Sequence, residues 1–262
     1  MSSIPLKINL YLSANEKIKH SPPWLRAIFK GFWLGILNRR ELQIVDRIYY
    51  EQTGNYCDET YNKSGFLDWE RRAFLKFFQS CQTLLVTAIG GGRECVALNR
   101  LGFDADGFEC NRQLFEFAEK LFEQEKVEGE FHLAPPDAVW HFGKIYDGAI
   151  IGWGAYMLIQ GRERRIDFLK KMRVQMSEGA PLLVSFFARQ SDEIYFKRIY
   201  AIANFFRALL GREKIELGDE LKPLSFVHWF SEAEINAEFA EADFKVIYYN
   251  QDEYGHAVGL AA

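Results

Sequence analysis

Residues 84–94 are Leu84-Leu85-Val86-Thr87-Ala88-Ile89-Gly90-Gly91-Gly92-Arg93-Glu94, and the rest of the chain is organised around them. A short apolar run followed by glycines predicts a buried strand that enters a tight turn. The next residues, 95–101, have helical character and end at Gly102. A strand, a glycine turn and a helix together bring bare backbone N–H groups and the positive end of a helix up to a ligand. We therefore expect a ligand site at this turn.

The composition limits the class of protein. The chain has 262 residues, enough for one large domain or for a domain with an added cap. Its net charge of −4 argues against a general nucleic-acid binder, which needs a cationic surface to neutralise phosphates. Aromatic residues make up 16% of the chain, and 23 residues are Phe. This content favours an aromatic-lined pocket for an apolar or flat ligand.

The cysteines give no sign of a metal or disulfide framework. Cys57, Cys81, Cys95 and Cys110 show no C-x-x-C spacing and have no neighbouring histidines, so we expect no metal and four reduced thiols. The N-terminus lacks the charged and then apolar pattern of a signal peptide. No apolar run approaches the roughly twenty residues that a membrane span needs. These features predict a cytoplasmic protein.

Residues 1–80 are predicted to form a helical cap. The segment 23–40 is unusually apolar, and Arg26 and Lys30 stand one helical turn apart within it. Three interpretations stay open: a helix buried against the main domain, a lid over an apolar substrate, or a helix lying on a membrane surface, hence a peripheral membrane contact. Tyr56 and Tyr61 follow, and they either close over a ligand from the cap or pack as core aromatics.

From residue 84 onward the pattern alternates between strands and helices, which is typical of a parallel sheet with crossovers. Predicted strands lie at 84–89, 104–111, 130–134, 146–151, 182–187, 244–249 and 256–261. The last two are too close for a parallel crossover and must form an antiparallel hairpin. We therefore expect an α/β fold: residues 81–262 form a Rossmann-like domain with a seven-stranded, doubly wound, mostly parallel sheet and an antiparallel C-terminal hairpin. A helical substrate cover is predicted at about 190–228.

Polar side chains follow the strands where an open α/β sheet holds its ligand. Glu109 ends the second strand, where a carboxylate can accept both hydroxyls of a ribose that carries no phosphate; the alternative is a surface acid. Asp137 follows the third strand and is either a partner for an exocyclic amine or a helix N-cap. Gly152 and Trp153 follow the fourth strand and can lie against a base or a sulfonium.

Two other nucleotide motifs are missing from the turn. A dinucleotide site needs G-x-G-x-x-G, but the last position of that pattern is Cys95 when counted from Gly90 and Arg93 when counted from Ala88. The pattern G-x-x-x-x-G-K-S/T is also absent. A nicotinamide, flavin or P-loop nucleotide is therefore disfavoured.

Residues 84–262 resemble the class I S-adenosylmethionine-dependent methyltransferases. Ala88-x-Gly90-x-Gly92 stands where that family has G-x-G-x-G, the hairpin matches its reversed seventh strand, and 226–235 resembles the Phe-Ser segment before its last helix. Ala88 replaces the first glycine and Val86 an acid, so the methionine amine needs another partner. The resemblance implies S-adenosylmethionine as cofactor, S-adenosylhomocysteine as product, and the cofactor-binding set Ala88, Gly90, Gly91, Gly92, Glu94, Glu109, Cys110, Asn111, Asp137, Ala138, Gly152 and Trp153.

The chemistry that this resemblance implies is an in-line displacement, in which an acceptor atom attacks the sulfonium methyl and the protein supplies alignment. His228 is the predicted catalytic base or substrate orienter; the alternative is a structural histidine with local hydrogen bonds. The predicted substrate-binding residues are Tyr56, Tyr61, Tyr156 and His228.

The segment after the fourth strand points away from nucleic-acid substrates. Ile151-Gly152-Trp153-Gly154 contains neither the Asn-Pro-Pro-Tyr type of tetrapeptide nor the Pro-Cys pair of nucleobase methylation. We expect a small organic molecule or a short peptide of apolar or aromatic character, methylated on a hydroxyl or carboxylate oxygen. Two alternatives stay open: N-methylation of a small molecule, and a non-catalytic protein that binds S-adenosylmethionine. The sequence does not indicate an oligomeric state.

Overall fold

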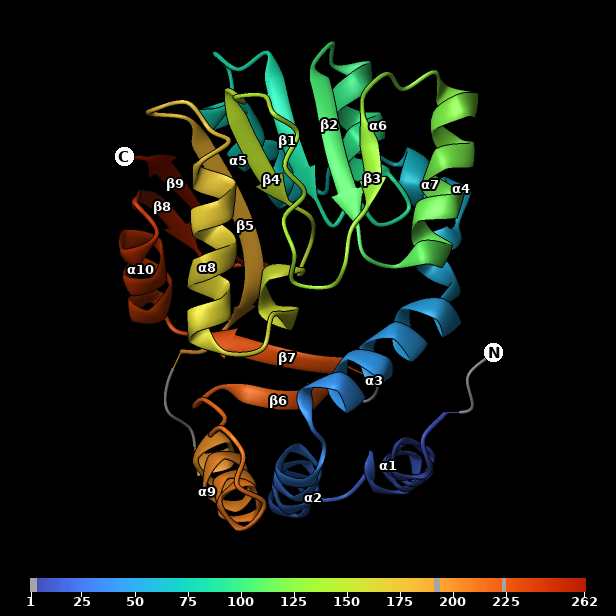
Figure 1. Cartoon of the computed structure of the whole chain (residues 1–262), viewed down its shortest axis with the longest axis vertical. Helices are drawn as coiled ribbons and strands as arrows, with labels where there is room; N and C mark the ends of the chain where they lie inside the picture. Colours follow the sequence, from blue (N-terminus) through green and yellow to red (C-terminus); the bar gives the residue numbers. More distant parts are fainter. Residues whose placement is uncertain (1–3, 191–193, 223–224) are drawn as a thin grey trace.

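The computed structural model describes residues 4–190, 194–222 and 225–262. Five strands pair in parallel in the order β3-β2-β1-β4-β5 (Figure 1): β1 (Thr83–Thr87), β2 (Asp104–Glu109), β3 (Phe131–Leu133), β4 (Gly148–Ile151) and β5 (Pro181–Ala188). On the other side of β5, β9 (Gly255–Ala261) runs antiparallel to it, and β8 (Phe244–Asn250) pairs antiparallel with β9. The expected seven strands and the C-terminal hairpin are thus confirmed.

Within the described residues the sheet holds two more strands than expected, nine instead of seven. β6 (Asp219–Lys222) and β7 (Ser225–Phe230) pair antiparallel, and β7 pairs in parallel with the end of β5 through Phe187–Trp229 and Ala188–Phe230. These strands fall in the predicted cover at 190–228, of which residues 191–193 and 223–224 lie outside the described chain. The cover is therefore not wholly helical; its helix is α9 (Ile194–Leu209).

Helices cover both faces of the sheet because neighbouring residues of a strand point to opposite faces. On β1, Leu84 and Val86 pack with α5 (Asp68–Phe77), α6 (Arg93–Arg100) and α7 (Arg112–Glu125). Leu85 points the other way and packs with α8 (Arg162–Arg173), α10 (Glu232–Glu241) and the 3-10 helix η2 (Tyr156–Leu158). This arrangement is the doubly wound architecture that the sequence predicted.

The N-terminal helices connect two parts of the molecule. α2 (Pro23–Ile36) lies between α9 and α1 (Leu6–Ile18), and the three helices form a layer separated from the main sheet by β6 and β7 (Figure 1). α3 (Arg39–Gln52) then runs to the sheet, followed by the 3-10 helix η1 (Gly54–Cys57) and α4 (Glu59–Lys63), which packs on α6. α5 belongs to the core of the sheet domain. A separate unit ending at residue 80 stays a prediction.

α2 and α9 approach each other closely through two glycines. A Cβ at Gly31 would lie 2.9 Å from Cβ of Ile202, and a Cβ at Gly35 would lie 2.6 Å from Cβ of Phe206 and 3.0 Å from the carbonyl oxygen of Ala203. Both neighbouring Cβ atoms are fixed to a helix backbone and cannot rotate away. The close contact of the two helices therefore requires glycine at both positions.

We predict that Gly35→Ala destabilises the protein by about 1–2 kcal/mol, because overpacking at the α2–α9 contact outweighs the better helix propensity of alanine. Urea unfolding followed by circular dichroism measures the change. Gly54→Ala is the matched control, since a Cβ there would meet nothing within 4 Å. Equal unfolding midpoints for Gly35→Ala and wild type would show that α2 and α9 are not in this close contact.

Candidate functional site

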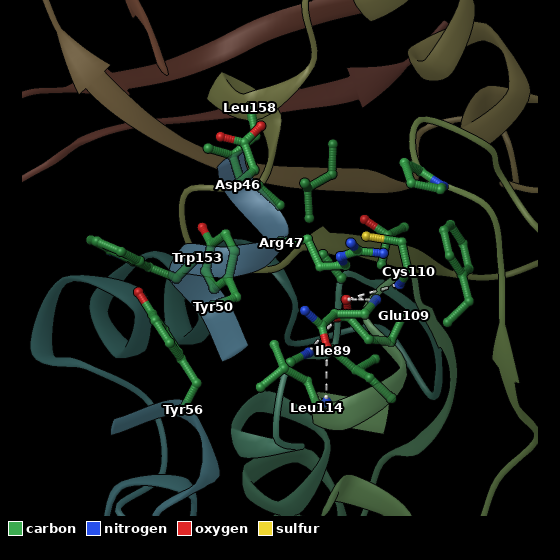
Figure 2. Close-up of a pocket in the computed structure, with 18 of the residues that line it drawn as sticks. Asp46, Arg47, Tyr50, Tyr56, Ile89, Glu109, Cys110, Leu114, Trp153 and Leu158 are labelled. Atoms are coloured by element: carbon green, nitrogen blue, oxygen red, sulfur yellow. Dashed lines mark hydrogen bonds between the residues drawn. The ribbon is translucent and has the colours of Figure 1, made fainter. Parts of the chain in front are cut away.

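A cavity of about 360 Å³ lies at the carboxyl ends of β1, β2 and β4, between the sheet and α3 (Figure 2). This volume is within the range of small-molecule sites. Asp46, Tyr50, Trp153 and Leu158 lie on one side of the cavity in Figure 2, and Glu109, Cys110, Ile89 and Leu114 lie on the other. The cavity is where the sequence predicts the ligand of an open α/β sheet.

The glycine turn forms one wall of this cavity. Ala88 has φ +51° and Gly90 has φ +56°, so Ala88 adopts the left-handed conformation that glycine favours. Gly90 lines the cavity, and a Cβ there would meet nothing within 4 Å. Gly91 also lines it, packed so closely under the cap that a Cβ would overlap the carbonyl oxygen of Tyr56. The turn therefore presents bare backbone to a ligand.

Gly92 and Gly152 serve the structure of the turn and do not line the cavity. Gly92 precedes α6 with φ +101°, and a Cβ there would lie 2.5 Å from the Phe122 ring. The N–H of Gly152 donates to the Thr87 carbonyl at 2.8 Å, and a Cβ at Gly152 would overlap the carbonyl oxygen of Ala88. Both glycines thus allow neighbouring parts of the chain to pack closely around the turn. Their placement does not support a direct contact with a ligand.

Glu109 is held by backbone amides. Its Oε2 accepts from Gly90 N–H, and its Oε1 accepts from the N–H groups of Cys110 and Asn111, each at 2.8 Å (Figure 2). Only 4% of Glu109 is exposed, so it is not a surface acid. Burial raises the pKa of this carboxyl, and the three amides counteract that rise. A carboxylate accepts about four hydrogen bonds, so Oε2 keeps room for a ligand donor.

Asp137 lines the cavity next to Ala138 and is connected to α3. Its Oδ2 accepts from Arg39 Nη2 at 2.5 Å and from Gln43 Nε2 at 3.3 Å. No helix begins at Asp137, which has φ +60°, so the N-cap interpretation is wrong. The interaction with α3 fixes the position of the carboxylate at the wall of the cavity.

Glu94 and Trp153 meet at the end of β4. Oε1 of Glu94 accepts from Arg93 Nη2 at 2.6 Å and from Trp153 N–H at 3.4 Å. Arg93 also forms two hydrogen bonds to Glu70, at 2.5 and 2.7 Å, and lies over the Tyr61 ring, 5.6 Å from its centre. The turn, α5 and the cap are therefore joined through one buried guanidinium.

The predicted aromatic residues of the cap reach the cavity. Tyr56 and Tyr61 both line it, with ring centres 6.1 Å apart, and the Tyr56 ring lies 5.2 Å from that of Tyr50 (Figure 2). Burial raises the pKa of Tyr50 and Tyr56, so both phenols stay neutral at physiological pH. Together they give this half of the cavity an aromatic lining with neutral hydroxyl groups.

α3 adds a polar face that the sequence prediction missed. Gln43, Asp46, Arg47 and Tyr50 all line the cavity. Their spacing of i, i+3, i+4 and i+7 is the signal that could have found them, since it places them on one side of a helix. Oδ1 of Asp46 accepts from Phe226 N–H at 2.6 Å, and no cationic side chain of the described chain pairs with this carboxylate. Burial raises the pKa of Asp46.

Tyr156 and His228 do not line the cavity, which corrects their predicted contact with a substrate. Tyr156 is fully buried and donates its hydroxyl to Glu238 Oε2 at 2.6 Å. His228 is also fully buried, with Nδ1 at 2.7 Å from Asp219 Oδ1. Burial lowers the pKa of His228 to about 4, so the ring is neutral. The hydrogen bonds and the burial of both residues are those of core positions.

Neither a metal site nor a membrane-spanning helix was found among the described residues. Among residues 4–190, 194–222 and 225–262, no group of three or more His, Cys, Asp and Glu side chains could hold a metal ion. Within the same ranges, none of the helices has the length and apolar character that crossing a bilayer requires. Cys57, Cys81, Cys95 and Cys110 are free thiols.

Solved structures resemble this chain along most of its length. A methyltransferase described as S-adenosylmethionine-dependent, from Methanosarcina mazei, is 16% identical over 75% of this chain and 98% of its own, with a TM-score of 0.58. The CcbJ methyltransferase from Streptomyces caelestis is 14% identical over 84% and 96%, with a TM-score of 0.57. The 1,6-didemethyltoxoflavin-N1-methyltransferase from Burkholderia thailandensis, which contains S-adenosylhomocysteine, is 11% identical over 87% and 92%, with a TM-score of 0.60.

No protein-family model and no curated protein sequence matches this chain. At these low identities the structural matches establish the fold alone. The chain therefore has the class I, Rossmann-like fold of the S-adenosylmethionine-dependent methyltransferases.

Proposed function

We propose that this protein is an enzyme that transfers the methyl group of S-adenosylmethionine to a small organic molecule. The observation that carries the proposal is the position of Glu109 at the cavity, where three backbone amides orient its carboxylate beside the bare backbone of Gly90. A carboxylate in this position suits a ribose hydroxyl. The methyltransferase fold supports the same cofactor.

The residues present fit this cofactor in three places. Glu109 keeps acceptor capacity for the ribose, and Asp137 and Ala138 lie where the adenine is expected. Thr87 lines the cavity, and its buried Oγ1 has no hydrogen-bond partner in the described part of the chain. We assign this hydroxyl to the methionine ammonium group, in place of the acid that is missing at Val86. When bound, the cofactor supplies an electrophilic methyl group.

The rest of the cavity suits an apolar or aromatic acceptor. Tyr50, Tyr56, Trp153 and Leu158 surround the space beside the glycine turn (Figure 2). Their side chains can exclude water and orient a flat molecule, which is the protein's part in a displacement reaction. Asp46 faces the same space and can accept a proton or a hydrogen bond.

The carboxylate of Asp46 limits which kind of acceptor atom suits the cavity. An ionised Asp46 disfavours a carboxylate acceptor, because two like charges would meet in one buried site. We therefore place the hydroxyl oxygen of our sequence-based proposal first and its carboxylate version behind it, since Arg40 and Arg47 line the same cavity and suit a carboxylate. An amine nitrogen is the second candidate, because the uncompensated charge of Asp46 also suits an ammonium group. Two structural matches are consistent with nitrogen chemistry: CalS10 is named an amino pentose methyltransferase, and the Burkholderia thailandensis protein is named an N1-methyltransferase.

The free cysteines and the overall charge support two further parts of the proposal. Four free thiols suit a reducing compartment, so we propose that the protein works in the cytoplasm. A net charge of −4 supports small molecules or short apolar peptides, and not nucleic acid, as partners.

We predict that Glu109→Gln weakens the binding of S-adenosylhomocysteine by tenfold or more, since hydrogen bonds to a charged group are worth about 1.5–3 kcal/mol. Isothermal titration calorimetry measures the affinity. Asp104→Asn, at the exposed start of the same strand, is the control and should bind like wild type. The proposal fails if wild-type protein binds no S-adenosylhomocysteine, or if Glu109→Gln binds it unchanged.

We predict that Asp46→Asn lowers kcat/KM by about a hundredfold while S-adenosylhomocysteine affinity stays at the wild-type value, because the residue acts on the acceptor as a general base. Burial raises the pKa of Asp46, so the wild-type rate should rise with pH above the range of an exposed aspartate. The variant should lose that rise.

The assay is S-adenosylhomocysteine release from matched aromatic alcohols, amines and carboxylates. Glu119→Gln, on the exposed side of α7 and away from the cavity, is the control. Turnover of the amines alone would select the second candidate. Cofactor binding without turnover of any acceptor would favour the non-catalytic alternative.

A further inference from the structure

α2 exposes a row of large apolar side chains. Trp24, Ile28 and Phe32 are 52%, 43% and 37% exposed, and their spacing of four residues places them on one face of the helix. Ala27 and Leu34, on another side of the same helix, are fully buried. The interpretation of 23–37 as a buried helix therefore accounts for only one of its faces.

α9 extends this apolar surface. Phe205 and Leu209 are 60% and 68% exposed and again four residues apart. The ring of Phe206 connects the two helices, with its centre 5.1 Å from that of Phe32 and 5.4 Å from that of Phe205. We call Trp24, Ile28, Phe32, Phe205 and Leu209 the apolar helix face. α1 lies beside α2 in the same layer and exposes Leu6 and Leu10 (Figure 1).

The charges of this layer differ from those of the rest of the chain. Residues 4–38, which end before α3, contain five Lys and Arg and one Glu, and residues 194–214 contain five Lys and Arg and one Glu. The two segments thus carry a net charge of +8, although the whole chain carries −4. The remaining residues therefore carry −12. A basic layer of helices with exposed aromatic and aliphatic side chains stands at one end of an otherwise acidic protein.

The positive charge of the layer favours one kind of binding partner for the apolar helix face over another. A second copy of the chain would bring two basic layers together, and like charges across an interface cost several kcal/mol. An anionic bilayer satisfies both features, since its lipids attract Lys and Arg and its acyl boundary accepts Trp, Phe and Leu. We propose that α1, α2 and α9 bind the surface of an anionic membrane. The protein then lies on the bilayer, and this property is independent of the proposed catalytic activity.

Co-sedimentation of the full chain with lipid vesicles tests the proposal. Vesicles of phosphatidylcholine with about one third phosphatidylglycerol should bind the protein, and vesicles of pure phosphatidylcholine should not. Binding should weaken as salt rises, because salt screens the attraction. The double variant Ile28→Gln/Phe205→Gln should lower the partition coefficient for the anionic vesicles by about tenfold or more, since two exposed apolar side chains are lost.

The matched control is Leu75→Gln/Val174→Gln, which removes two equally exposed apolar side chains from other parts of the molecule. This control should bind vesicles like wild type. Circular dichroism melting verifies that both double variants fold. Failure to bind anionic vesicles, equal binding to neutral vesicles, or equal losses in both double variants would overturn the proposal. A dimer in analytical ultracentrifugation that Ile28→Gln/Phe205→Gln dissociates would also overturn it and assign the face to a second copy.

Discussion

The ion pairs of Arg93 determine the shape of the ligand cavity. A buried guanidinium is costly unless it is paired, and Arg93 is paired by Glu70 of α5 and by Glu94 of its own helix. A further hydrogen bond, from Arg93 to the carbonyl oxygen of Gly65 at 3.0 Å, holds the segment before α5. Because Arg93 is the first residue after the glycine turn, these contacts fix the turn relative to α5 and to the segment that precedes it. The wall formed by Gly90 and Gly91 keeps its place only while these charges remain matched.

Local signals in the sequence were sufficient for the fold and for one half of the cavity. The alternation of Leu84, Leu85 and Val86 between two buried faces is a property of the strand itself, so it is visible without tertiary information. Glu109 could be placed because parallel strands end at one edge of a sheet, which brings it beside a turn nineteen residues earlier in the chain. Ala88 is the position where this chain departs from the glycine motif. Its positive φ shows that the backbone keeps the left-handed conformation without a glycine.

The half of the cavity beside Asp46 and Tyr50, where we place the methyl acceptor, depends on contacts between residues far apart in the sequence. Local sequence patterns do not reveal such contacts. Asp46 faces the cavity because Phe226, on β7, donates to it across 180 residues of sequence. β6 and β7 were not predicted from the sequence. The strand against which α3 packs was therefore missing from the prediction, and the sequence could not show that the polar face of α3 points into the cavity. His228 was misassigned for the same reason: in β7 it alternates into the core, where Asp219 of β6 accepts its hydrogen bond. A histidine next to a predicted helix has no signal that distinguishes these two directions.

Besides the many aromatic side chains of the core, two groups of aromatic residues have separate physical explanations. Tyr50, Tyr56 and Trp153 are at the cavity, where their rings replace water around a ligand. Trp24, Phe32 and Phe205 lie on the outside of a basic layer, where a soluble monomer gains nothing from exposing them. Core packing explains neither group, and the cavity explains only the first. Exposed rings of the second kind lower solubility unless an interface covers them. Their association with a net charge of +8 therefore indicates a surface shaped for binding.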